Sequence, residues 1–466
     1  MDAPKNNFYP QNPVPSGLPV SITPVPTAIP GFIGYTERRG TPDNPIPSKK
    51  INGFEIAEPV RIHSPEEYVK IFGRSPAATI HVTISENLNP TTKRTAERSI
   101  HVDCDIPPLH KMYYHLQLYF ANGGGPCYII SAGTLSGQSI EVDALIAGIE
   151  MAATCQEITL LTCPQTEQLE EKDATSIYHA MLQQAGQLQD RFAILDCFDN
   201  NQAFRTREVV GKDFLQFGAV YHPYLKTALP VIFEDASFRI THIIDGVAQP
   251  HVFGDLSDLL KKEINTMAGK LTVELPPSAI IAGVYLKNDL SRNVWTAPAD
   301  IILSEVTSPT ISLDEKDQAA HIADMATGKS INIIRLIPHK GNVVIGARTL
   351  AGNDRQWKFI SMRRLVIMIE TSIRRSIQPF VFEANDSHTW VRIQLLIENF
   401  LQMLWHRNVL QGATPDHAFF VKVGIGETMT VDDVQNGRLI IDVGIALTIP
   451  SEFLTLRFEL QTGTPA

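Results

Sequence analysis

The chain has 466 residues, of which 44% are hydrophobic and 19% are charged, and its formal net charge is −10. This length allows two or three hydrophobic cores of ordinary domain size. The negative net charge disfavours a broad electrostatic nucleic-acid surface, so we expect no nucleic-acid partner. There is no run of about 18 apolar residues, so we expect no direct membrane insertion. The opening MDAPKNNFYPQNP lacks the features of a secretory signal, which predicts synthesis and assembly in the cytoplasm.

Cysteine and histidine spacing gives no sign of a metal or cofactor site. The five cysteines are odd in number, irregularly spaced and without a CxxC pair. The 14 histidines include no HExxH and no HxH. We therefore expect reduced, mostly buried thiols, no metal and no cofactor.

Residues 1–26 are predicted to form an extended N-terminal arm. Residues 1–30 contain eight prolines, a density that excludes a helix or a central strand. Three of these prolines occupy odd positions, so in an extended chain their missing N–H groups fall on one edge. The N–H groups that remain on the other edge belong to Val14, Ser16, Leu18 and Val20. Such a segment can add to a sheet by one side only; the alternative is a flexible polar tail.

Residues 27–135 are predicted to contain two strands, two helices and an insert. In PVRIHSPEEYVKIFG a strand precedes a helix, with Ser64 as N-cap, Pro65 at the first helical position and Glu67 completing a capping box. Residues 75–107 are predicted to be an irregular insert. A later helix ends at Asn122-Gly123-Gly124-Gly125 and the strand CYIIS follows. Because this order is the reverse of a phosphate loop, we predict a turn rather than a nucleotide site.

Residues 136–349 are predicted to be a central α/β domain. Short apolar runs at 157–163, 192–197 and 217–223 alternate with helical segments, which is typical of a parallel sheet covered on both faces. Asp196 and Cys197 end one of these strands, with His179 and His222 nearby in sequence. This grouping leaves one alternative function open, a cytoplasmic α/β enzyme with a nucleophilic Cys197.

Residues 350–450 are predicted to form a C-terminal domain of two helices and a strand, followed by a strand arm at 451–466. The first helix carries Met362, Leu365/Val366, Ile369, Ile373 and Ile377 at helical spacing, and the second begins after Asp386 and is predicted to stop at Gly412. In RLIIDVGIALTI the odd positions from Leu439 are apolar. The final strand places Leu454, Leu456, Phe458 and Leu460 on one face. It can pair within its own subunit or with the next one.

A local group of cations is predicted on the first of these helices. The set comprises Lys358, Arg363, Arg364, Arg374 and Arg375, with Glu370 as the one acid among them. Two interpretations are open, a solvated polar face and a docking surface for an acidic partner.

Several stretches, in this order, resemble the contractile tail sheath family of phages and related injection systems. They include PGFIGYTERRG with EPVRIHSPEEYVKIFG, LQLYFANGGGPCYIIS, LPPSAIIAGVYLKNDLSRNVWTAPAD and INIIRLIPHKGNVVIGARTL. The C-terminal stretches are WKFISMRRLVIMIETSIRRSIQPFVFEANDSHTWVRI, LWHRNVLQGATPDHAFFVKV and MTVDDVQNGRLIIDVGIALTIPSEFLTLRF. The resemblance covers about two-thirds of the chain but not residues 75–107.

The resemblance implies a non-enzymatic structural subunit. Its fold would be an α+β sheath core from the N- and C-terminal parts, an outward α/β domain and terminal arms that exchange strands between subunits. It implies partners: six copies per ring in a helical sheath, an inner tube protein, and baseplate and terminal cap proteins. It places the C-terminal domain, with part of the N-terminus, against the tube, and the cations at 358–375 are our candidate for the tube-facing surface. The particle would be a phage tail, or a released or anchored injection particle. A non-contractile filament scaffold is a further alternative.

Overall fold

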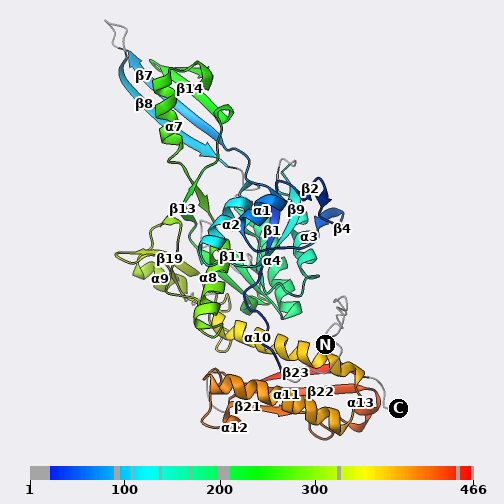
Figure 1. Ribbon diagram of the computed structural model, residues 1–466. Helices are drawn as coiled ribbons and strands as arrows, with labels where there is room; N and C mark the ends of the chain where they lie inside the picture. Colours follow the sequence, from blue (N-terminus) through cyan, green and yellow to red (C-terminus); the bar gives the residue numbers. More distant parts are fainter. Residues whose placement is uncertain are drawn as a thin grey trace. The chain divides into compact units, whose positions relative to one another are not determined.

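The computed structural model describes residues 21–88, 95–106, 110–135, 139–167, 169–197, 210–322, 327–447 and 452–462. Its contacts divide the chain into two units (Figure 1). Unit 1 combines the chain up to Thr27 with the chain from Ser361 onward, and unit 2 is Ala28–Ile360. The chain therefore passes between the units twice, at Thr27–Ala28 and at Ile360–Ser361.

A nine-stranded sheet forms the centre of unit 2. Its strands, in spatial order, are β17 (Ile301–Ile302), β20 (Gly341–Ile345), β19 (Asn332–Ile337), β12 (Gly218–His222), β11 (Phe192–Asp196), β10 (Leu160–Thr162), β1 (Pro30–Thr36), β9 (Cys127–Thr134) and β6 (Val60–Ile62). The run from β19 to β9 is parallel. This confirms the predicted parallel sheet. It also corrects the predicted boundary at 135/136, because strands from both sides of that point share one sheet.

Helices cover both faces of this sheet because successive side chains of a buried strand point in opposite directions. Phe32 on β1 packs edge-on against Tyr119 of α2 (Met112–Ala121), at 5.1 Å between ring centroids. Ile33 belongs instead to a core cluster that includes Leu145 and Leu182. These two residues lie on α3 (Val142–Ala152) and α4 (Glu171–Leu188). Helix α8 (Ser278–Arg292) packs beside α2 on the first face.

Smaller elements surround the sheet. They are β2 (Gly40–Thr41), β3 (Asn44–Pro45), β4 (Ser48–Ile51), β5 (Phe54–Ala57), α1 (Pro65–Phe72), β13 (Leu225–Pro230), β16 (Thr272–Leu275), β18 (Val306–Pro309) and α9 (Glu315–Ile322). In α1 the Ser64 side chain accepts a hydrogen bond from the Glu67 N–H at 3.2 Å, as predicted. The Glu67 carboxylate, however, accepts from the N–H of His63 rather than that of Ser64.

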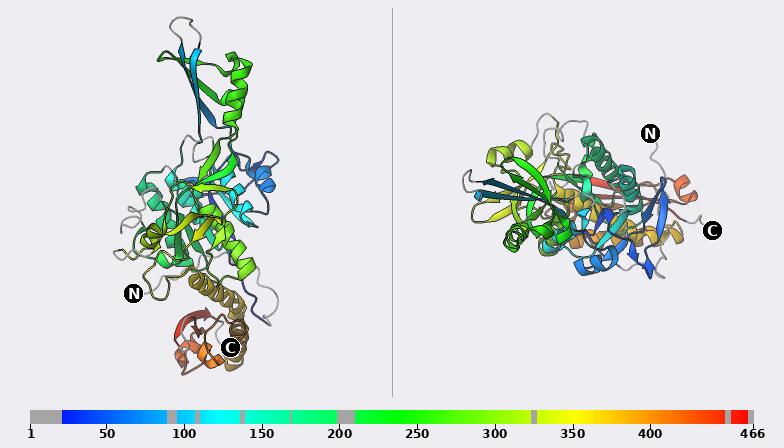
Figure 2. Two further views of the ribbon diagram at one scale, coloured as in Figure 1. Left: turned by 90° about the vertical axis from the view of Figure 1, so that its left-hand side faces the viewer. Right: turned by 90° about the horizontal axis from the view of Figure 1, so that it is seen from above.

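The predicted irregular insert is a regular hairpin. Strands β7 (Thr79–Leu88) and β8 (Thr95–Asp105) pair antiparallel, and β7 also pairs with β14 (Phe238–Ile244), which continues to β15 (Val247–His251). Helix α7 (Asp258–Ala268) covers one face of this four-stranded sheet (Figure 2). The sequence pattern of 75–107 alone did not show this fold, because half of the sheet comes from residues about 150 positions later.

Unit 1 consists of two long helices and an antiparallel sheet. Helix α10 (Ile360–Ile377) and helix α11 (Ser387–His406) match the predicted periodicity. Helix α11 ends six residues before Gly412, which corrects its predicted stop. The sheet has the order β21 (Phe419–Lys422), β22 (Arg438–Ala446) and β23 (Phe453–Gln461), with the short helices α12 (Pro415–Ala418) and α13 (Val431–Gln435) between its strands. The boundary of this unit is 360/361, not the predicted 349/350, because Arg348 forms a β-bridge with Phe359 inside unit 2.

Close packing of α2 against α8 depends on Gly283. A Cβ built at Gly283 would lie 2.6 Å from the main-chain oxygen of Tyr119, which cannot rotate away. We predict that Gly283→Ala lowers the free energy of unfolding by roughly 1–3 kcal/mol, although alanine favours helix. Ser291→Ala, on the exposed part of the same helix, should change it little. Urea unfolding followed by circular dichroism measures both; equal stability of Gly283→Ala and wild type would contradict the packing argument.

Candidate assembly surfaces

The β21–β22–β23 sheet has one buried face and one polar face. Leu439, Ile441 and Val443 of β22 are fully buried and pair in register with residues of β23. The opposite face carries a cross-strand row in which Arg457 makes a bidentate ion pair with Asp442, at 2.7 and 2.8 Å. Within the described part of the chain, neither outer edge of the sheet has a strand partner. Unit 1 therefore offers two free edges to an incoming strand.

The structure describes one of the two predicted arms. Leu454, Leu456, Phe458 and Leu460 lie on β23 and face the buried side, and β23 is paired with β22 of the same chain over its whole length. The sequence left open whether this strand pairs within its own subunit or with the next one. In the single chain it pairs within its own subunit. The other arm residues, Val14, Ser16, Leu18 and Val20, lie outside the described residues. Exchange of strands between subunits stays a prediction.

The last residues of the N-terminal segment lie along α10. The N–H of Val25 donates to the Ser372 hydroxyl at 3.0 Å, and the Arg364 guanidinium donates to the carbonyl of Thr27 at 2.9 Å. Ile22 is buried as well. Residues 21–27 thus pack on a helix that lies more than 300 positions later in the chain.

The structure divides the predicted cation group. Arg363 and Arg364 are only 5% and 3% exposed, so they present no charge to a partner in this conformation. Arg374 is half-buried and Arg375 is exposed. Lys358 lies in unit 2, with its ammonium 5.0 Å from the centre of the Phe359 ring. The prediction of one exposed surface is therefore wrong for the first two arginines, while a role for Arg374 and Arg375 remains untested.

A buried ion pair accounts for Arg363. Its guanidinium lies 3.6 Å from the Glu370 carboxylate, two helical turns further along the same face. Burial lowers the pKa of Arg363 to about 10, and Glu370 opposes this shift. Burial raises the pKa of Glu370, against the effect of Arg363 and Arg374. Removing one partner would leave the other charge buried, so the two residues act as a structural unit.

The residues of the alternative enzyme hypothesis do not form an accessible site among the described residues. Cys197 and His222 are buried, and they follow β11 and end β12 respectively. His179 is exposed on α4. Burial in apolar surroundings opposes formation of the thiolate that a nucleophile requires. The likeness of Cys197 to a catalytic cysteine therefore has no support in the geometry.

Asp196, at the carboxyl end of β11, caps a helix instead. One carboxylate oxygen accepts the N–H of Ser278 and the other accepts its hydroxyl, both at 2.6 Å, at the first residue of α8. Burial raises the pKa of Asp196 to about 7, although the two hydrogen bonds from Ser278 oppose the shift. Close by, Lys111 and Glu167 form a buried ion pair at 3.0 Å. Proteins of the α/β class commonly bind ligands at this end of the strands, and here the Asp196 carboxylate is engaged in a structural contact.

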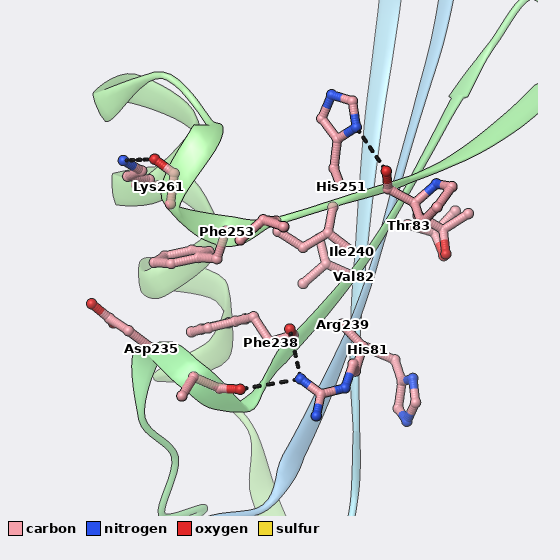
Figure 3. Close-up of a pocket in the computed structure, with 15 residues that line it drawn as sticks. His81, Val82, Thr83, Asp235, Phe238, Arg239, Ile240, His251, Phe253 and Lys261 are labelled. Carbon is pink, nitrogen blue, oxygen red and sulfur yellow. Dashed lines mark hydrogen bonds between the residues drawn. The ribbon is translucent and has the colours of Figure 1, made fainter.

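A pocket of about 640 Å³ lies at the edge of the four-stranded sheet (Figure 3). The rings of Phe238 and Phe253 stack in it at 4.3 Å. Its two cations bond to the local backbone: Arg239 donates to the carbonyls of Ala236 and Phe238, and Lys261 donates to that of Gly254. Arg239 thus stabilises the chain where β14 begins, and Lys261 stabilises it just after β15 ends. No described helix is long and apolar enough to cross a membrane.

Comparisons with known proteins agree with this fold. The family model for the phage tail sheath C-terminal domain matches residues 353–461. The structure of the anti-feeding prophage helical sheath in its contracted state aligns with a TM-score of 0.63 and 28% identity, covering 98% of this chain and 99% of the other. A chain of the six-fold symmetrised anti-feeding prophage baseplate aligns with a TM-score of 0.62 and 27% identity, covering 98% and 99%.

A third structure shares the fold. The sheath complex of an extracellular contractile injection system, PVC, in its contracted state aligns with a TM-score of 0.62 at 24% identity, over 98% of this chain and 97% of the other. A search of curated protein sequences finds no match. The matches to sheath proteins point to a structural role. Residues 353–461 thus match the phage tail sheath family, and the chain as a whole is similar to sheath proteins of contractile injection systems.

Stability should fall as the pH rises through the range in which Asp196 titrates. Its carboxyl has an ordinary pKa of 3.8 when unfolded and about 7 when folded, so its contribution is fully present below pH 4 and is lost as the pH passes 7. Asp196→Asn should reduce the loss of unfolding free energy between pH 5 and pH 8 by on the order of 2–3 kcal/mol. The exposed Asp143→Asn is the control and should follow wild type. Urea unfolding at both pH values measures the difference; parallel slopes would refute this role.

Proposed function

We propose that this chain is the structural subunit of a contractile sheath. Copies assemble as stacked rings of six around an inner tube, and contraction of the sheath drives the tube through a target envelope. The observation that carries the proposal is the end-to-end likeness to the contracted helical sheath of the anti-feeding prophage, at 28% identity over 98% of the chain. The baseplate and a terminal cap are further partners, and the particle is a phage tail-like injection device.

Strand exchange links the subunits in this proposal. The outer edges of β21 and β23 carry main-chain donors and acceptors without a strand partner among the described residues. If residues 13–20 of a neighbouring copy are extended, Val14, Ser16, Leu18 and Val20 offer N–H groups on one edge, whereas Pro13, Pro15 and Pro19 offer none on the other, which suits addition to a sheet edge. Main-chain hydrogen bonds at such a joint persist while the bodies that they connect rotate. Neighbouring subunits therefore stay linked during contraction.

The tube-facing surface is assigned to unit 1, at the end of α10 that carries Arg374 and Arg375. Their side chains reach solvent, unlike those of Arg363 and Arg364. Exposed ion pairs are weak and screened by salt, so a contact of this kind can hold the tube and then release it. Contraction itself needs two packings of the same subunits, with the compact packing lower in free energy.

Electron microscopy of the purified protein, alone and with its tube protein, tests the proposal. Stacked rings or cylinders that occur in a long narrow form and a short wide form are expected. Cylinders of one form only would indicate a non-contractile scaffold. Discrete small particles together with an activity that depends on Cys197 would indicate an enzyme and overturn the proposal.

Removal of residues 1–20 should abolish polymerisation and leave a folded subunit, because Ile22 and the hydrogen bonds of Val25 and Thr27 with α10 are kept. Removal of β23 is not an equivalent test, since it would expose Leu439, Ile441 and Val443. Light scattering and electron microscopy measure assembly, and circular dichroism measures folding. Normal cylinders from the shortened protein would eliminate exchange of the N-terminal arm.

Charge reversal at the end of α10 should weaken docking on the tube. Arg374→Glu with Arg375→Glu is expected to reduce the fraction of sheathed tubes by about tenfold. High salt should weaken docking of the wild type, and a return to lower salt should partly restore it. Exposed Arg407→Glu is the control for added negative charge in unit 1. Counting sheathed tubes in micrographs gives the result. Equal counts for the double variant and the control would remove this surface from the proposal.

A further inference from the structure

We propose that Tyr114 of α2 fixes the direction of the four-stranded sheet within unit 2, as a positioning residue at the joint through which this sheet is attached. We call β7, β8, β14, β15 and α7 the small module (Figure 1). Tyr114 acts through the backbone of the segments that enter the module. The inference concerns the single subunit, so it goes beyond the proposed function and does not depend on it.

Three of the segments that connect the small module to the rest of unit 2 meet at one point, Ile232. The carbonyl of Ile232 accepts a hydrogen bond from the N–H of Ala78 at 2.7 Å, one residue before β7 begins. The N–H of Val231 donates to the carbonyl of Leu271 at 3.2 Å, on the segment that follows α7. Residues 75–78, 231–232 and 271 are therefore joined to one another by their main chains, and we call them the joint.

The Tyr114 hydroxyl links the joint to α2. It accepts a hydrogen bond from the N–H of Ile232 at 3.0 Å, and the Ser75 side chain is a second polar neighbour. Tyr114 is 2% exposed and Ser75 is 5% exposed, so bulk water has little access to these contacts. One hydroxyl on a helix that covers the nine-stranded sheet thus holds two of the three segments.

Lys111, just before the first residue of α2, holds a strand beside the joint. Its ammonium donates to the main-chain oxygen of Glu274 on β16 at 3.2 Å and lies 3.0 Å from the Glu167 carboxylate. Glu167 follows β10 of the nine-stranded sheet. The start of α2 therefore grips both strands that lead into the joint: Lys111 contacts β16 itself, and Tyr114 contacts the residue two positions beyond the end of β13.

Loss of the hydroxyl would free the joint from α2 without detaching the module. In Tyr114→Phe the ring still fills its place, but the N–H of Ile232 loses its acceptor. The main-chain hydrogen bonds within the joint remain, so the joint stays intact and moves as one piece. The segments then bend where β13 and β16 meet the joint, and the module samples a wider range of directions. A regular assembly requires every copy to present the module alike, which a fixed joint provides.

Hydrogen exchange in the unassembled full-length protein tests the contact. The N–H of Ile232 should exchange at least about fivefold faster in Tyr114→Phe than in Tyr113→Phe, the control that removes a hydroxyl from the neighbouring, half-buried residue of the same helix. Peptides from β14 and from β11 should exchange alike in both variants, because neither sheet is disturbed. Equal exchange at Ile232 in both variants and wild type would overturn the proposal. Faster exchange throughout unit 2 would overturn it too, because it would show a general loss of packing.

The direction of the module is measured as a distance between two spin labels, one on β8 at Ser99→Cys and one on α4 at Gln183→Cys, both at exposed positions. The half-buried native thiols Cys104 and Cys155 are replaced by serine in every protein compared. Wild type and the control variant should give one narrow distance distribution, and Tyr114→Phe a distribution about twice as wide or wider. Equal widths in all three proteins would overturn the positioning role, even if hydrogen exchange differs. Failure of the wild type to form cylinders would refute the proposed function and leave this result unchanged.

Discussion

The return of residues 21–27 to α10 is the constraint on which the rest of the architecture depends. Hydrogen bonds from Arg364 and to Ser372 hold a segment that precedes the nine-stranded sheet against a helix that follows it. Unit 2 is consequently an insertion whose two ends leave unit 1 together. Closing a loop of this length costs conformational entropy, but the cost grows only slowly with length, so burial of Ile22 and the two hydrogen bonds can sustain it.

Periodicity in the sequence predicted the helices and strands whose buried face can be recognised from their own residues. Helices α10 and α11 have apolar stripes at helical spacing, and β22 and β23 alternate, so each pattern has one interpretation. The parallel strands β10 to β12 were predicted instead from short apolar runs between helical segments. Glycines at 123–125 ended α2 as expected, because Gly123 takes a positive φ of 95° that other residues rarely adopt.

Long-range contacts explain what the sequence did not predict. Arg363 and Arg374 are three turns apart and share a helical face, yet one is buried and the other reaches solvent. Helical periodicity gives the face of the helix on which a side chain lies. Whether that part of the face is buried depends on distant segments that pack on it, such as residues 21–27. The hairpin at 75–107 was missed because its partner strands come from 238–251. The boundary at 135/136 failed for a related reason, since sequence order does not give strand order.

The sheet edges differ in a way that bears on assembly. In the four-stranded sheet, edge strand β15 has five residues and contains Pro250, and edge strand β8 carries alternating charges that include Glu97 and Asp103. Short strands, proline and charge all hinder pairing with another chain. In unit 1, β23 is a nine-residue edge without proline, and its outward side chains Thr455, Arg457 and Glu459 project from the faces, not along the edge. The outer edge of β23, which has none of these features, therefore lies in unit 1, and residues 21–27 of the arm also belong to that unit. Exchange of strands between copies requires an accessible sheet edge of this kind.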